Sequence, residues 1–116
     1  MMKTIALIFC LLMTGCAADK AFLAGDDLYR QERYGEAAAE YAKVLLENPD
    51  KQEFRLKLLE SRTKAALQHY QQGTRWMAEK NYREAVAEFT RATLFDGSLD
   101  AARQELKTAQ RLLNIH

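Results

Sequence analysis

Few side chains in this sequence have the types and spacing needed for chemistry. The two cysteines, Cys10 and Cys16, lie near the start of the 116-residue chain, and the two histidines, His69 and His116, lie far from both. This spacing does not suit a metal ion. The adjacent acids Asp26-Asp27 would diverge on a helix and lie on a solvated face, and there is no phosphate loop or nucleophile–base set. We therefore predict no enzymatic activity, no metal site and no cofactor.

An apolar run near the start predicts export and a lipid anchor. Lys3 supplies a positive charge, and residues 4–13 suit a signal peptide but are too short to cross a bilayer. The run leads into Thr14-Gly15-Cys16, which resembles the lipobox of bacterial lipoproteins, where the signal is cut before the cysteine and the cysteine is acylated. We predict a signal peptide over residues 1–15 and lipidation of Cys16. The alternative is an ordinary secretory signal with a chance cysteine.

The same resemblance predicts a location. Ala17 follows the cysteine, whereas an aspartate there would retain a lipoprotein at the inner membrane in enterobacteria-like sorting. The resemblance therefore implies the outer membrane, with the protein facing the periplasm on a lipidated tether of residues 16–20. Without residues 1–15, the chain has 16 basic and 16 acidic side chains, because Lys3 is the only charged residue removed. This balance gives no pull towards nucleic acid.

Residues 25–46 and 73–94 are one sequence unit written twice. The two copies, GDDLYRQERYGEAAAEYAKVLL and GTRWMAEKNYREAVAEFTRATL, agree at a constant offset of 48 residues. The matched pairs include Gly25 and Gly73, Tyr34 and Tyr82, Ala37 and Ala85, Tyr41 and Phe89, and Leu46 and Leu94. A repeat of this kind predicts helical hairpins that present a surface to a partner.

The order of glycine, aromatic, alanine and aromatic in each copy resembles the tetratricopeptide repeat (TPR), a hairpin of two helices about 34 residues long. Pro49 follows the first copy as the family's terminating proline would, and Gly97 stands there in the second. The copies lie farther apart than in the family. The resemblance implies close helix contacts at Ala37 and Ala85.

The sequence predicts an all-α fold of about five helices over residues 21–116. We expect TPR-like hairpins, an elongated middle helix of about 30 residues capped by Asp50, and a C-terminal capping helix that begins after Ser98. The first expected helix runs from residue 18 or 20 to 33, and the second from 35 or 36 to 47. The third runs from its cap at Asp50 to about residue 80, the fourth covers 82–95 and the fifth covers 99–113.

The long middle helix has apolar or small residues at alternating steps of three and four. This seam consists of Leu56, Leu59, Thr63, Ala66, Tyr70, Gly73 and Met77. One interpretation is that the whole seam packs on neighbouring helices. The other is that its first half, with Phe54, Leu58 and Leu59, forms an apolar patch that associates with another protein.

The TPR resemblance also implies a binding groove along the first helix of each hairpin. The implied residues are Phe22, Asp26, Tyr29 and Arg30 in the first copy and Tyr70, Thr74 and Met77 in the second. Phe22 and Asp26 stand where chaperone-binding relatives need lysine and asparagine, so we expect an apolar helix or extended segment as ligand instead of a peptide carboxylate. For Tyr70 and Met77 the alternative is a core role, and Trp76 is expected to be structural.

The combination of signals resembles the TPR module that precedes the secretin domains of type II secretion and type IV pilus systems. It predicts a membrane-anchored scaffold that binds proteins of a bacterial envelope machine, with a secretin among the expected partners. Neither nucleic acid nor a small-molecule substrate is expected. The alternative function is that of a structural or outer-membrane and cell-wall assembly lipoprotein unrelated to secretins.

Overall fold

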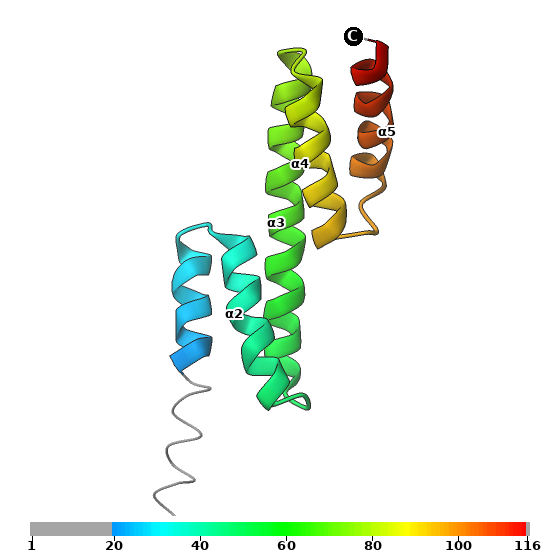
Figure 1. The fold of residues 1–116 in the computed structure, drawn as a ribbon. Helices are drawn as coiled ribbons and strands as arrows, with labels where there is room; N and C mark the ends of the chain where they lie inside the picture. Colours follow the sequence, from blue (N-terminus) through cyan, green and yellow to red (C-terminus); the bar gives the residue numbers. More distant parts are fainter. Residues whose placement is uncertain (1–19, 116) are drawn as a thin grey trace, which may run out of the picture. The chain divides into compact units, whose positions relative to one another are not determined.

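A computed structural model describes residues 20–115, and the predicted signal peptide and Cys16 lie outside them. The described residues are helical apart from short turns and contain no strand, which confirms the all-α prediction. None of their helices is long and apolar enough to cross a membrane. Figure 1 shows the helices, which are residues 20–30, α2 (Tyr34–Glu47), α3 (Gln52–Ala78), α4 (Tyr82–Phe95) and α5 (Asp100–Ile115).

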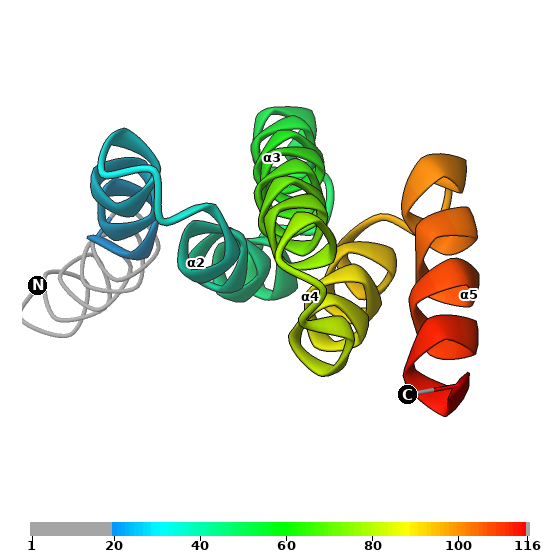
Figure 2. The ribbon, with the colours of Figure 1, turned by 90° about the horizontal axis from the view of Figure 1, so that it is seen from above.

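The chain divides into two compact units within α3, between Ser61 and Arg62. The first unit holds helix 20–30, α2 and the start of α3, and the second holds the rest of α3, α4 and α5. Within each unit the helices pack side by side: helix 20–30 beside α2, and α4 beside α5 (Figure 2). Since α3 begins at Gln52 and α5 at Asp100, the offset of the sequence repeat extends to the third helix of each unit.

In each unit an aromatic ring packs directly against a glycine of the neighbouring helix. A Cβ atom added to Gly25 would lie 2.7 Å from Cε1 of Tyr41, and one added to Gly73 would lie 2.6 Å from Cε1 of Phe89. Side chains at these glycines would therefore collide with a fully buried ring. Ala37 and Ala85, the expected sites of close contact, are both fully buried.

The turn between the first two helices of each unit has the same backbone geometry. Glu32 and Lys80 have φ angles of 61° and 60°. The amide that follows each of them donates to a carbonyl five residues back, from Arg33 to Leu28 at 3.0 Å and from Asn81 to Trp76 at 2.9 Å. This is the Schellman ending of a helix, in which glycine is the usual left-handed residue.

Three predicted helix starts are wrong by one or two residues, and the first helix ends at residue 30 instead of Arg33. The second helix begins at Tyr34 instead of Gly35 or Glu36. The third helix begins at Gln52, so Lys51 precedes it instead of Asp50, and the helix has 27 residues instead of about 30. The fifth helix begins at Asp100. Ser98 does not cap it, because its amide and hydroxyl both donate to Oδ1 of Asp96, at 3.0 and 2.5 Å, and form a turn of their own.

The predicted seam of α3 is correct only in the second unit, where Ala66 and Gly73 are buried. In the first unit, Leu56 and Leu59 are 59% and 63% exposed, and the first part of α3 packs through Phe54 instead. Phe54 lies two positions before Leu56 and hence on nearly the opposite side of the helix. The interpretation in which the whole seam packs is therefore wrong for the first half of the helix.

Candidate functional site

The predicted groove residue Phe22 is half-buried and packs against the core of the first unit. Its ring centroid lies 4.9 Å from that of Phe54 and 5.6 Å from that of Tyr41. Phe54 is only 6% exposed and clusters with Val44, so its assignment to an exposed patch on the long helix is wrong. The rings at these positions therefore pack against one another within the first unit, where burial of aromatic side chains stabilises a small core.

The sequence predicted that Asp26 would lie on a solvated face, and this prediction is wrong. Its carboxylate is half-buried and accepts a hydrogen bond from the hydroxyl of Tyr41. Burial raises the pKa of the Tyr41 phenol above its ordinary value, and the Asp26 carboxylate raises it further, so the hydroxyl stays protonated as a donor. Arg30 pairs with the neighbouring acid Asp27 at 3.3 Å on the exposed surface. The two adjacent acids therefore have separate partners.

Tyr29 joins the first helix to the start of α3. Its hydroxyl donates to Oε1 of Glu60 at 2.7 Å, and its ring packs edge-on to Tyr34 with centroids 5.0 Å apart. Nζ of Lys57 lies 5.4 Å from the centroid of the same ring. The polar and aromatic groups of Tyr29 are therefore used within the first unit.

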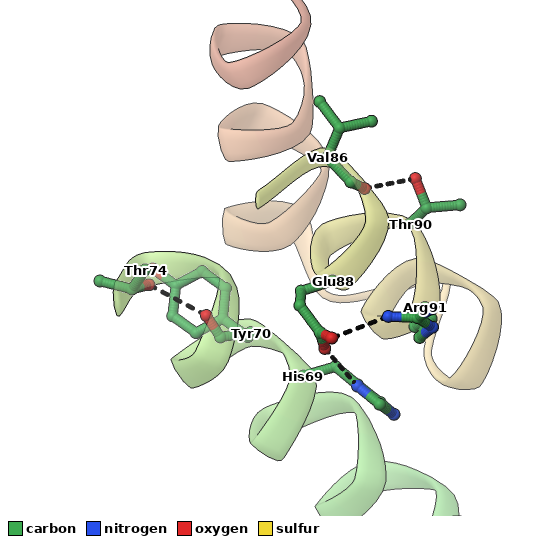
Figure 3. A network of polar contacts seen from close by, with 7 residues as sticks. All are labelled: His69, Tyr70, Thr74, Val86, Glu88, Thr90 and Arg91. Atoms are coloured by element: carbon green, nitrogen blue, oxygen red, sulfur yellow. Dashed lines mark hydrogen bonds and ion pairs between the residues drawn. The ribbon is translucent and has the colours of Figure 1, made fainter. Parts of the chain in front are cut away.

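The three residues predicted for the groove in the second copy differ in burial. Tyr70 and Met77 are half-buried against the cluster that contains Phe89, and Trp76 packs against that cluster too. This agrees with the alternative in which Tyr70 and Met77 are core residues. Thr74 is exposed, and its hydroxyl donates to the carbonyl of Tyr70 at 3.0 Å (Figure 3).

A buried acid at Glu88 was missed by sequence reasoning. One carboxylate oxygen lies 2.6 Å from Nδ1 of His69, and the other accepts from Nη1 of Arg91 at 2.7 Å (Figure 3). The His69 ring stacks on Phe95 with centroids 5.6 Å apart. Both partners satisfy a carboxylate that would be costly to bury alone, and no group of three or more possible metal ligands occurs among the described residues. We interpret this cluster as a structural clamp between α3 and α4.

A hollow in the described part of the first unit lies where α2 ends and α3 begins. It has a volume of about 440 Å³, a size typical of binding pockets, and is lined by Ala42, Leu45, Leu46, Pro49, Arg55 and Leu58. The predicted patch residue Leu58 is therefore half-buried in its wall. Leu59, also predicted for that patch, is 63% exposed and is not among the lining residues. We call the six lining residues the first-unit hollow.

Two other hollows are weaker candidates because each is lined by one helix or by one helix and the turn directly after it. One, of about 580 Å³, lies along Asp100, Arg103, Gln104 and Lys107 of α5. The other, of about 310 Å³, lies along Gln72, Arg75, Trp76 and Glu79. Both are surfaces with several charged groups, whereas residues of α2, the turn and α3 together line the first-unit hollow.

The second unit is an internal control for the first-unit hollow. Arg55, Leu58 and Leu46 have the same residue types at the equivalent positions, Arg103, Leu106 and Leu94. The other positions change from apolar residues or proline to polar residues or glycine. Ala42, Leu45 and Pro49 correspond to Thr90, Thr93 and Gly97. The helical framework is therefore compatible with polar residues here, and the apolar lining of the first unit is not required by the fold.

Comparison with known proteins adds no assignment to this geometry. No protein-family model matches the chain, and no curated protein sequence matches it.

Proposed function

We propose that this chain is a lipid-anchored helical-repeat protein that binds another protein of a bacterial envelope machine. The first-unit hollow is the docking surface. The observation that carries this proposal is the apolar lining of that hollow: Ala42, Leu45 and Pro49 stand where the second unit has threonine, threonine and glycine, and Leu46 beside them is 84% exposed. Apolar side chains that a framework does not need and that stay exposed to water favour association.

The lipid anchor and the class of partner are supported by sequence patterns. The apolar run that leads into Thr14-Gly15-Cys16 supports acylation, and Ala17 in place of an aspartate supports attachment to the outer membrane on its periplasmic side. The repeat resembles the TPR module found ahead of secretins, which supports a secretin of a secretion or pilus system as the partner. A structural or cell-wall assembly role would instead give a partner unrelated to secretins.

A matched pair of substitutions tests the docking surface. Leu46 and Leu94 are equivalent in the repeat, and they are 84% and 72% exposed. We expect Leu46→Asp in the full chain to lose crosslinks to its membrane partner, since a charge would enter the apolar hollow, while Leu94→Asp keeps them. The measurement is crosslinking in membranes followed by mass spectrometry.

Two outcomes would contradict the proposal. If both aspartate variants crosslink like the wild type, the hollow is not the docking surface. If Cys16→Ser leaves the protein processed and still in the membrane fraction, the anchor proposal is wrong. A secretin among the crosslinked proteins supports the expected partner class, and a reproducible envelope partner of another class rejects it.

A further inference from the structure

Arg55 supplies the charge at the rim of the first-unit hollow. Its Nη2 donates to the carbonyl of Pro49 at 2.7 Å, and the side chain is exposed. A guanidinium has five N–H donors in one plane, so this bond orients the group and leaves other donors for a ligand. The proline that forms part of the apolar wall thus also holds the arginine in place.

The equivalent arginine in the second unit is already paired with an acid. Arg103 forms an ion pair with Asp100 one turn earlier on α5. In the first unit the position of Asp100 is occupied by the neutral Gln52. Within residues 20–115 no carboxylate pairs with Arg55. The repeat therefore keeps the arginine in both units and places an acid beside it only in the second.

We propose that the hollow recognises an amphipathic helix of the partner that carries a carboxylate beside its apolar side chains, and that Arg55 binds this carboxylate. This inference rests on the proposed function of the hollow as a docking surface. Leucine-like side chains of the partner would pack on Leu45, Leu46 and Leu58. A helix suits this site because the walls are helices and it satisfies its own backbone hydrogen bonds. The neighbouring apolar groups exclude water and strengthen the pairing of a guanidinium with a carboxylate.

The test uses two synthetic amphipathic peptides of equal length with one leucine face. They differ only in a glutamate or a glutamine beside that face. Fluorescence anisotropy measures the binding of each peptide to the full chain in detergent, to Arg55→Gln and to the matched control Arg103→Gln. We expect the glutamate peptide to bind wild type and Arg103→Gln roughly fivefold more tightly than the glutamine peptide, the size expected of one partly exposed ion pair. In Arg55→Gln the two peptides should bind equally.

The outcomes separate this inference from the proposed function. If wild type binds both peptides equally and Leu46→Asp weakens both, the hollow is a docking surface and the role of Arg55 is wrong. If Arg55→Gln still prefers the glutamate peptide, the carboxylate is bound elsewhere and the inference is wrong. If neither peptide binds wild type, both the inference and the assignment of the hollow are wrong. Arg55 is exposed, so its substitution should leave the fold intact, and circular dichroism checks this.

Discussion

Both units have an aromatic ring packed on a glycine, but the ring also forms a side-chain hydrogen bond in the first unit. In the first, the ring is Tyr41, and its hydroxyl donates to Asp26. In the second, the ring is Phe89, and the position of Asp26 is occupied by the exposed Thr74. The hydroxyl and its acceptor are thus present together or absent together. Positions that stay constant between the units show what the framework requires, and positions that change show where it tolerates other chemistry.

The largest effects should come from breaking the contact that both units share. We expect Gly25→Val and Gly73→Val to lower the free energy of unfolding by about 3 kcal/mol each, because the new side chain would collide with a buried ring. Urea denaturation followed by circular dichroism measures this. Ala24→Val, at an exposed position on the same helix as Gly25, is the control and should cost well under 1 kcal/mol, roughly the propensity difference. If either glycine accepts valine at no greater cost than Ala24, the ring-on-glycine packing is wrong for that unit.

A smaller effect should follow from removing the hydroxyl that distinguishes the first unit. Tyr41→Phe leaves the half-buried Asp26 carboxylate without its donor and should cost about 1.5 kcal/mol. Adding Asp26→Thr installs the pair found in the second unit and should recover most of that loss. A double-mutant cycle of denaturation curves measures the coupling. If Asp26→Thr costs the same stability in the wild type as in the Tyr41→Phe variant, the two groups are not coupled.

The turns offer a way to gain stability in both units. Glu32 and Lys80 have left-handed φ angles of 61° and 60°, which glycine adopts more readily. We expect Glu32→Gly and Lys80→Gly each to raise the free energy of unfolding by roughly 0.5–1 kcal/mol, because relief of this conformation exceeds the entropy that glycine adds to the unfolded chain. Gln31→Gly, at a position without a left-handed φ, should be destabilising. A loss of stability in both turn variants would contradict the shared Schellman ending.

Most of the helices could be predicted because helix formation depends on residues close in sequence and because the same sequence unit occurs twice. Residues 82–95 were predicted as a helix with the bounds that the structure has, and a constant offset linked each element to its copy. The prediction that the seam of α3 packs was wrong for the first half of the helix. Leu56 and Leu59 continue the spacing of three and four residues but are exposed, because spacing alone does not say which side of a helix a neighbouring helix covers.

The candidate site was harder to predict because it depends on contacts between helices. Glu88 and His69 are 19 residues apart and meet only when α4 lies against α3. The first-unit hollow combines the end of one helix with the start of the next, and of its lining residues only Leu58 was expected in a binding surface. Phe22, Asp26 and Tyr29 were assigned to a groove because the family pattern specifies positions, whereas burial decided their roles. Comparing the two copies position by position could have shown the apolar hollow.

The smallest expected effect concerns the ends of the second helix in each unit. Asp96 follows α4 where Asn48 follows α2. The hydroxyl and amide of Ser98 donate to the Asp96 carboxylate and hold its pKa below its ordinary value, with a smaller contribution from Arg62. Because the pKa is lower in the folded state, the stability that Asp96 adds is complete above its unfolded pKa of about 3.9. It is lost as the pH falls from there through the folded pKa.

Asp96→Asn, which copies the first unit, should remove this part of the acid dependence of stability and leave the rest of the pH curve unchanged. Urea midpoints measured from pH 6 down to pH 2 test this, with Asp50→Asn as the control for removing an exposed carboxylate. An unaltered slope in Asp96→Asn would mean that the turn at Ser98 does not depend on the charge of Asp96.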